Sequence, residues 1–324
     1  MGYVGRNRDN ASFATLAAVA ILASLLSIYW FTPISSGNPV VCDDCAPAPA
    51  ISVSKAGAGG GSDAGAPAVG EISPVATPVI SAKAGAIVDD RCGRLIFSKE
   101  AHRRLAPASL TKIAAAIVAL EAADVNKLVD VDVDGFYYGD STVMGLETGM
   151  RLTLRDLLYG LLLPSGNDAA VAIARHVAGD VPAFVARMNA KAKSLGLADT
   201  HFTNPHGLDA PGHYSSAYDM AILARYAMKN PLFAEIVRTK TWQPQWPGPE
   251  LWNGNLLLWL YPESDGVKIG WTEGAGQTMV ATAASGGRRL FVALLGSQDR
   301  YTDAIRLLDW GFQQPEEACN VGGW

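Results

Sequence analysis

The stretch LLPSGNDAAV, at residues 162–171, joins two apolar segments with helical spacing, and the interpretation of the chain starts from it. Thr153 and Asp156 have capping-box spacing at the start of the first segment. NDAAVAIARHVA is typical of a second helix, which would end at Gly179. Ser165 and Asn167 therefore lie in a short turn between two helices, where polar side chains are held still enough for chemistry.

The letters SGN also occur in PISSGNPV, at residues 33–40, in a different setting. Residues 32–82 consist largely of Ala, Gly, Pro and Ser and show little apolar periodicity. Such a segment buries too little apolar surface to offset its chain entropy, so we expect a flexible linker. Because a flexible linker cannot position catalytic groups, we take the second SGN, at residues 165–167, as the candidate active-site segment.

Residues 12–31, SFATLAAVAILASLLSIYWF, contain no charged side chain. About 20 helical residues, rising ~1.5 Å each, span the ~30 Å hydrocarbon layer of a membrane. Arg6 and Arg8 precede the stretch and the next positive charge is Lys55, so the positive-inside rule places residues 1–11 in the cytoplasm. No small-residue cleavage site follows, so we expect an uncleaved transmembrane anchor; a buried core helix is the alternative.

These features divide the chain into a cytoplasmic tail at 1–11, an anchor at 12–31, a linker at 32–82, a globular unit at 83–318 and a tail at 319–324. The predicted location is a cell membrane, crossed once, with the globular unit on the extracytoplasmic side. A formal net charge of −5 and the lack of a basic run argue against nucleic acid as a partner.

Four cysteines, Cys42, Cys45, Cys92 and Cys319, would lie in this oxidising exterior, and they allow three pairings. Cys42 and Cys45 form a CxxC, which could be redox-active or, with a second pair, bind zinc. Because this CxxC falls in the linker, we favour a local disulfide over a metal site. Cys92 and Cys319 flank the globular unit, and we predict that they are bonded to each other.

Strand patterns occur at both ends of the globular unit, with helical patterns between them. The predicted strands are GAIVDD at 85–90, RLIFSKE at 94–100, DGVKIGWT at 265–272, GQTMVATAA at 276–284 and RRLFVALLGS at 288–297. Besides the helices around the SGN turn, the predicted helices are SLTKIAAAIVALEAA at 109–123, VPAFVARMNAKAKSLG at 181–196, MAILARYAM at 220–228, after a Ser216 and Asp219 capping box, and YTDAIRLLDWGF at 301–312. This order predicts an α+β fold with one antiparallel sheet and a helical lobe.

Ser109 and Lys112 open the first of these helices, three residues apart, so their side chains share one face. A serine hydroxyl is a poor nucleophile until a base takes its proton. Lysine serves as that base only when its pKa falls, through burial, the positive end of the helix dipole or a second cation. Ser52 and Lys55 match the same SxxK pattern, but they lie in the predicted linker, which cannot hold two side chains in a fixed relative position.

Four segments in order, PASLTK, LLYGLLLPSGNDAA, TNPHGLD and DGVKIGWTEGAG, resemble the serine-type D-alanyl-D-alanine carboxypeptidases, the low-molecular-mass penicillin-binding proteins of peptidase family S11. The resemblance covers residues 84–312. It implies the penicillin-recognising serine hydrolase fold (β-lactamase/transpeptidase-like), with a five-stranded antiparallel sheet and a helical lobe, so that 83–318 would be a peptidase domain. It implies no metal and no organic cofactor.

By this resemblance, Ser109 would be the acylated nucleophile and Lys112 its general base. Ser165 and Asn167 would support proton transfer and orient the peptide. The expected reaction removes the terminal D-alanine of peptidoglycan stem peptides through a serine-bound acyl intermediate, and β-lactams would acylate the same serine. The alternatives are a β-lactamase or esterase on the same fold, and a non-catalytic cell-wall binding protein with a degraded site.

The resemblance also places a substrate-binding strand at Lys268, Ile269, Gly270 and Trp271. Lys268 would supply positive charge for the substrate carboxylate, and the backbone amides of Ser109 and Trp271 would form an oxyanion hole. The family usually has KTG or KSG here, and this chain has Ile269 in the middle position. The missing hydroxyl would cost ~1.5 to 3 kcal/mol, so we expect weakened or shifted substrate preference rather than an inert protein.

His201, His206 and His213 lie close together in the sequence and could suggest a metal site. There is no HExxH and few carboxylates are near, so we favour histidines that stabilise turns or line the substrate rim.

Four tryptophans, Trp242, Trp246, Trp252 and Trp259, could stack on sugar rings or line the peptide groove. We favour core packing because Trp259 falls in an apolar run, and we take Trp242 and Trp246 as the better surface candidates.

Overall fold

The computed structural model describes residues 76–139, 141–245 and 248–316, all within one unit, Glu71–Trp324. The predicted anchor, most of the linker, Cys42, Cys45 and the tail at 319–324 lie outside the described residues. Within the described ranges no single helix is long and apolar enough to cross a membrane, and one bent pair, Asn167–Ala178 with Val181–Ser194, passes that test by length and composition only.

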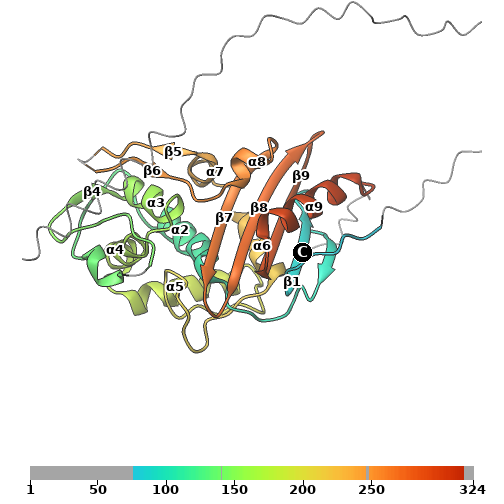
Figure 1. The fold of residues 1–324 in the computed structure, drawn as a ribbon. Coiled ribbons are helices and arrows are strands. Elements are labelled where there is room, and N and C mark those ends of the chain that lie inside the picture. Colours follow the sequence, from blue (N-terminus) through green and yellow to red (C-terminus); the bar gives the residue numbers. More distant parts are fainter. Residues whose placement is uncertain (1–75, 140, 246–247, 317–324) are drawn as a thin grey trace, which may run out of the picture. The chain divides into compact units, whose positions relative to one another are not determined.

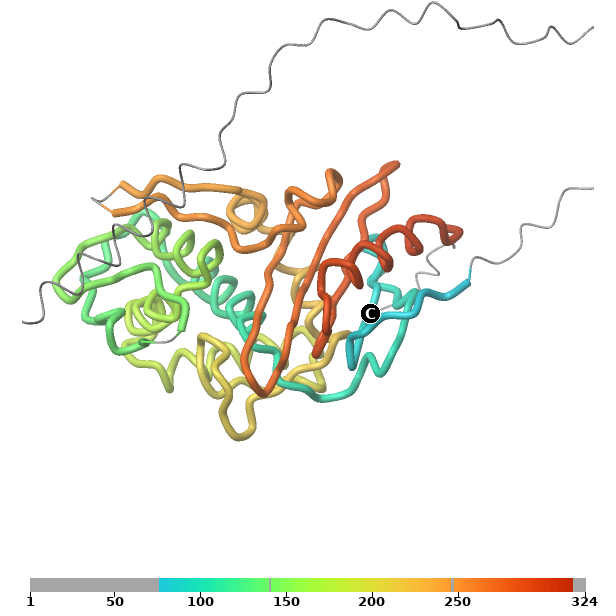
Figure 2. Tube along the Cα trace, viewed as in Figure 1, coloured from blue at the N-terminus to red at the C-terminus, as the bar shows by residue number. Residues whose placement is uncertain are grey.

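A five-stranded antiparallel sheet combines the two ends of the described chain, as predicted. Its strands, in spatial order, are β2 (Leu95–Lys99), β1 (Ala84–Asp89), β9 (Arg288–Ser297), β8 (Gly276–Ser285) and β7 (Ser264–Thr272). Figure 2 shows the early blue strands beside the late red ones. The edge strand β7 is therefore left open on one side, next to the helical lobe.

Both faces of the sheet are covered, and β9 shows how its sequence allows this. Leu290, Val292 and Leu294 pack toward α9 (Arg300–Gln313), which lies across β8 and β9 in Figure 1. The alternate residues, Phe291 and Ala293 among them, pack into the core shared with the helices. Since side chains alternate across a strand, a strand buried on both faces needs an unbroken apolar run, and LFVALL provides it.

Six helices of the second lobe pack around a core rich in Leu and Ala: α2 (Thr111–Ala122), α3 (Leu154–Leu162), α4 (Asn167–Ala178), α5 (Val181–Ser194), α6 (Ala217–Ala227) and α7 (Pro231–Arg238). Figure 1 shows α2 to α5 gathered on the β7 side of the sheet. The N-cap half of both predicted capping boxes forms, because Thr153 Oγ1 accepts from the Asp156 amide and Ser216 Oγ from the Asp219 amide, each at 3.1 Å. The α4 helix ends at Gly179, with φ of +86°, as expected.

The helix predicted at 109–123 begins with the 3₁₀ turn η1 (Ala108–Leu110) before α2. Several short elements had no sequence prediction: β3 (Leu128–Asp130), β4 (Arg151–Thr153), β5 (Thr241–Trp242), β6 (Leu251–Trp252), α8 (Leu257–Leu260) and the 3₁₀ turn η2 (Gly135–Tyr138). Each has two to four residues, too few for a period to show.

The prediction for the tryptophans is wrong in two respects. Trp242 is the packed one, stacked on Tyr159 with ring centroids 3.8 Å apart. Trp259 is 43% exposed, with the Lys240 ammonium 5.2 Å from its ring centroid, because the single turn of α8 buries Leu257 and Leu258 and turns Trp259 outward. Trp252 is also exposed, and Trp246 lies outside the described residues.

Cys92 is disulfide-bonded. Cys319 lies outside the described residues, so its pairing with Cys92 stays a prediction.

Candidate active site

Ser109 and Lys112 sit where η1 runs into α2, against the edge strand β7. Lys112 is fully buried, and its Nζ lies 2.9 Å from Ser109 Oγ. The same Nζ lies 2.6 Å from Asn167 Oδ1 and 2.7 Å from the His206 carbonyl oxygen. The structure thus brings the start of α2, the first residue of α4 and the TNPHGLD segment to one buried amine.

The orientation of the Asn167 amide follows from a chain of contacts behind it. A backbone carbonyl only accepts hydrogen bonds, so Ser141 Oγ donates to the Tyr138 carbonyl at 2.6 Å. The Ser141 oxygen is then free to accept, and it takes the Asn167 Nδ2 hydrogen at 2.9 Å. The amide oxygen of Asn167 therefore faces Lys112, as an obligate acceptor.

The surroundings of Lys112 shift its pKa. Burial holds the pKa of Lys112 well below its usual range, the charge on Lys268 lowers it further, and Asp168 acts in the opposite direction. A neutral amine has two hydrogens and one lone pair. In that form the amide oxygen of Asn167 and the carbonyl of His206 would take both hydrogens, and the lone pair would face the Ser109 hydroxyl. This is the arrangement that a general base for serine requires.

Lys268 lies on β7, 2% exposed, with its Nζ 3.1 Å from the Ile269 carbonyl oxygen. Burial and the nearby Arg300 guanidinium lower the pKa of Lys268 to about 7. Arg300 itself donates to the Gly270 carbonyl at 2.7 Å, so a second cation is fixed at the same strand. Two basic side chains, Lys268 and Arg300, therefore lie along β7 beside Ser109.

Gly270 is the point where β7 meets the nucleophile. A Cβ built there would lie 2.7 Å from the Ser109 backbone nitrogen and 2.6 Å from Thr278 Oγ1, so no larger residue fits without movement. The next residue, Trp271, is 65% exposed. The close approach of two backbones explains why a glycine follows Lys268 and Ile269.

The TNPHGLD segment binds the two lobes together around Lys112. Gly207 has φ of +92°, and a Cβ there would lie within 2 Å of the Ala108 carbonyl oxygen, a clash with backbone. Asp209 accepts from Thr272 Oγ1 at 2.8 Å and from the Gly274 amide at 3.0 Å, just beyond β7. In the sequence, only the family resemblance pointed to this segment. The structure shows that the segment lies against Lys112, because the His206 carbonyl contacts the Lys112 amine.

Comparison with known proteins fits this geometry. The family model of the peptidase S11 D-alanyl-D-alanine carboxypeptidases matches residues 72–299. The chain belongs to that family. D-alanyl-D-alanine carboxypeptidase DacD of Salmonella typhimurium is 39% identical over 251 residues, covering 73% of this chain and 64% of DacD. DacB2 of Mycobacterium tuberculosis is 39% identical over 236 residues, 70% of this chain and 80% of DacB2.

Two solved structures share the fold of this S11 chain. Penicillin binding protein 5 from Haemophilus influenzae superposes with a TM-score of 0.70 at 34% identity, covering 74% of this chain and 72% of that one. The Streptomyces K15 DD-transpeptidase gives 0.69 at 31% identity, covering 74% of this chain and all of its own. These matches confirm the penicillin-recognising fold class.

Ile269 departs from the family pattern, and its side chain packs away from Ser109. It contacts the core cluster formed with Leu257 and the α9 face of the sheet. Its Cδ1 lies 3.5 Å from the position of a Cβ on Gly254. Lys268 and Gly270, on the other side of the pleat, face the nucleophile. The S11 chain thus uses this position for packing.

Ser165 lies next to Asn167 but is not part of the Lys112 network. Its backbone is left-handed, with φ of +69°, and its buried hydroxyl has no hydrogen-bond partner among the described residues. The turn itself is fixed, because Thr142 Oγ1 donates to the Ser165 carbonyl at 2.7 Å.

Sequence reasoning missed Asp168, the residue after SGN. It is fully buried, and its carboxylate accepts from the backbone amides of Met144, Gly145 and Leu146 at 2.9 to 3.0 Å. These contacts hold the 143–146 loop against the start of α4. The sequence signal that could have identified Asp168 is its place as a carboxylate in the first turn of the helix that follows Ser165 and Gly166.

The three histidines do not form a metal site. No group of three or more His, Cys, Asp or Glu side chains in the described part of the chain could hold a metal ion. His201 is exposed, His206 contributes its carbonyl to Lys112, and His213 is buried against Thr111 and Thr203.

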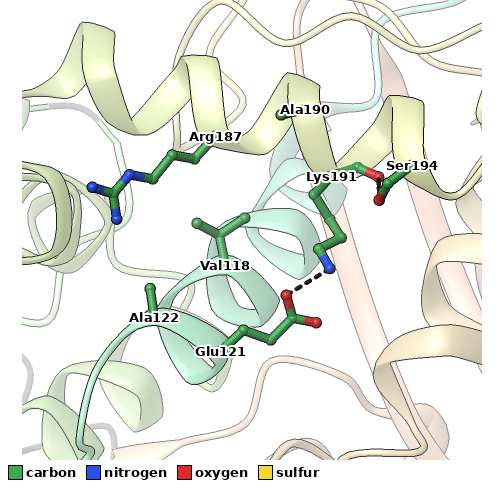
Figure 3. Close-up of a pocket in the computed structure, with 7 residues that line it drawn as sticks. All are labelled: Val118, Glu121, Ala122, Arg187, Ala190, Lys191 and Ser194. Carbon is green, nitrogen blue, oxygen red and sulfur yellow. Dashed lines mark hydrogen bonds and ion pairs between the residues drawn. The ribbon is translucent and has the colours of Figure 1, made fainter.

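A separate pocket lies where the far half of α2 meets α5 (Figure 3). Across it, Lys191 and Glu121 form an ion pair at 2.6 Å. None of the residues that line it belongs to the Ser109 network. The ion pair connects the end of α2 to α5.

Proposed function

We propose that the protein is a serine D-alanyl-D-alanine carboxypeptidase that removes the terminal D-alanine of peptidoglycan stem peptides through an acyl-enzyme on Ser109. The observation that carries this is the set of contacts around the buried Lys112 amine, which lies 2.9 Å from the Ser109 hydroxyl. In the neutral form of Lys112, its two hydrogens go to the Asn167 and His206 oxygens, which cannot donate, and its lone pair is left for that hydroxyl.

In the acylation step, Lys112 Nζ takes the proton of the Ser109 hydroxyl while Oγ attacks the carbonyl carbon of the penultimate D-alanine. The carbonyl oxygen becomes negative and is stabilised by the backbone N–H groups of Ser109 and Trp271. The C–N bond then breaks, and the amine of the departing D-alanine receives the proton from Lys112. A water molecule repeats the sequence on the Ser109 ester and releases the shortened peptide.

The remaining polar groups fit the two ends of the scissile bond. Lys268 binds the terminal carboxylate with its positive charge, and Asn167 orients Lys112 and the peptide. Ser165, whose hydroxyl is buried and unpaired in the described structure, passes the proton toward the departing amine. No metal or organic cofactor enters these steps.

Residues 12–31 anchor the protein in the cell membrane, with the catalytic domain on the extracytoplasmic side, where its polymeric substrate lies. The support for this location is the uncharged 20-residue stretch and the arginines before it.

Labelled penicillin tests the function directly, because a β-lactam resembles the D-alanyl-D-alanine terminus and acylates the same serine. We expect a covalent adduct on Ser109 that Ser109→Ala abolishes, and release of D-alanine from a D-Ala-D-Ala peptide. Faster turnover of the β-lactam than of the peptide would favour a β-lactamase. A folded protein with no adduct would favour a non-catalytic binding module.

Activity is expected to fall as pH rises through about 7, the value to which burial and Arg300 lower the pKa of Lys268. Above it Lys268 loses its proton and no longer attracts the substrate carboxylate, so kcat/KM falls toward tenfold per pH unit. The measurement is kcat/KM for a D-Ala-D-Ala peptide between pH 5.5 and 9.

Lys268→Arg is the matched variant, because a guanidinium stays charged across this range. It should flatten the alkaline limb even if its overall rate is lower. An alkaline limb that persists unchanged in Lys268→Arg would assign that limb to another group.

Ile269→Thr is expected to change carboxypeptidase activity by less than about threefold, because the side chain at 269 packs on the α9 face of the sheet, opposite Lys268. Threonine keeps the β-branched shape that suits β7. Ile269→Val, which changes size without adding a hydroxyl, is the control. A Thr variant that is about tenfold faster than the Val variant would show that the side chain at 269 reaches the substrate.

A further inference from the structure

His213 is a buried histidine behind the nucleophile, and the mechanism above gives it no role. It is 6% exposed, and it lies on the loop that follows TNPHGLD. Its Nε2 lies 2.8 Å from Thr111 Oγ1, and its Nδ1 accepts from the Thr203 backbone amide at 3.0 Å. Thr111 Oγ1 in turn lies 2.8 Å from the Ala108 carbonyl oxygen.

The direction of every hydrogen bond in this row is fixed by its two ends. The Thr203 amide can only donate, so His213 Nδ1 accepts and the ring hydrogen sits on Nε2. The Ala108 carbonyl can only accept, so the Thr111 hydroxyl donates its hydrogen to that carbonyl. The Thr111 oxygen then accepts a hydrogen bond from His213 Nε2. The ring is neutral in this arrangement. Burial, with the charge of His201, lowers the pKa of His213 to about 4, which keeps it so at neutral pH.

This row of hydrogen bonds ends at the peptide bond between Ala108 and Ser109, whose N–H belongs to Ser109. Ala108 has φ of +51°, a left-handed conformation that an alanine adopts only under constraint. The peptide between Ala108 and Ser109 is planar and trans, so its C=O and N–H point in opposite directions. A bond that fixes the Ala108 carbonyl therefore also aims the Ser109 N–H.

We propose that His213 is a positioning residue: through Thr111 and the Ala108 carbonyl, it aims the Ser109 backbone N–H at the oxygen that becomes negative during acylation. The inference rests on the proposed function, in which that N–H is an oxyanion donor. Gly207, pressed against the Ala108 carbonyl, limits the peptide from a second side. Neither His213 nor Thr111 touches substrate.

The test compares His213→Leu, His213→Gln and Thr111→Val with the unmodified protein. The first readout is the rate of Ser109 acylation by fluorescent penicillin. The second is the affinity for a peptide boronic acid, which forms a tetrahedral adduct with serine, against the same peptide without boron. An oxyanion donor that is misaimed weakens only the tetrahedral species. His201→Leu, on the same segment but exposed, is the matched control.

His213→Leu is expected to slow acylation and weaken the boronic acid by about 10-fold to 100-fold, with little change for the peptide that lacks boron. His213→Gln should recover most of the loss, because its amide N–H can donate to Thr111. Thr111→Val should match His213→Leu, and the double variant should lose no more than the larger single loss, since both act through one carbonyl. His201→Leu should behave as the unmodified protein.

The proposal is overturned if folded His213→Leu acylates at the unmodified rate, if both peptides weaken equally, or if the double variant shows additive losses. Should His213→Leu fail to fold, Thr111→Val decides by the same criteria. An unmodified protein that penicillin does not label would overturn the proposed function and this role with it. Labelling that all variants share equally would overturn this role alone.

Discussion

Replacing Lys112 by methionine is expected to slow the acylation of Ser109 by about 10³-fold, the middle of the range for removing a general base. Methionine has a similar length and suits a buried site, so the helix face stays filled. The base is lost, and the Asn167 and His206 oxygens lose the amine that bridges them. The measurement is the second-order rate constant for labelling by fluorescent penicillin, with circular dichroism to show that the variant is folded.

Lys268→Met is the matched control, because it removes the other buried amine of the cleft and leaves the base in place. It should raise KM for the peptide more than it slows labelling. Lys268 also depresses the pKa of Lys112 by its charge, so its removal should move the acid limb of the pH profile upward. A folded Lys112→Met variant within tenfold of the unmodified rate would show that another group takes the serine proton.

Asp168→Ala is expected to lower the free energy of unfolding by about 4 kcal/mol, because three loop amides lose a charged acceptor in a fully buried place. Alanine leaves those amides without a partner, and it leaves a space that the 143–146 loop cannot fill. The measurement is urea unfolding at neutral pH, where the midpoint should fall without a change in slope.

Asp180→Ala is the matched control for this second variant. Asp180 is also an aspartate at a helix start, but it is exposed and accepts from the Ala183 amide alone, at 2.7 Å. Its loss should cost about 1 kcal/mol, as for an ordinary N-cap. If the two variants lose equal stability, the Asp168 contacts contribute no more than a helix cap. Asp168→Ala should also lower activity, since the 143–146 loop that it holds directly follows Thr142, which fixes the Ser165 turn.

The sequence was sufficient where a feature depends on neighbouring residues. The bounds of α4 and β9 follow from apolar spacing and the glycine after α4, and both capping boxes are local pairs. The choice between two SGN triplets needed only the contrast between helical flanks and a linker. The contacts of Lys112 with Ser109 and Asn167 agree with the expected geometry, and Lys268 lies on β7, which packs against η1. The roles of these residues stay predictions until variants are measured.

The features that sequence reasoning missed depend on contacts between distant segments. The His206 carbonyl is a backbone atom, so no side-chain pattern marks it. Gly207 is required only because Ala108 passes over it. The exposure of Trp259 depends on a single turn of helix, for which hydropathy has no resolution. The packing of Ile269 on the α9 face of the sheet likewise depends on the position of β7 in the sheet. The residues at 268–270 alone do not predict it.

Because β1 pairs with β9, the sheet cannot close until the last strand has been synthesised. A nascent chain that ends before β7 already contains Ser109 and Lys112 on a helix, but it lacks Lys268 and the Gly270 backbone against which the nucleophile rests. Pairing of strands so distant in sequence is slow, and it comes late in folding. If the proposed function holds, an unfinished molecule is therefore inert, and labelling by penicillin would report that β7, β8 and β9 have been synthesised and paired.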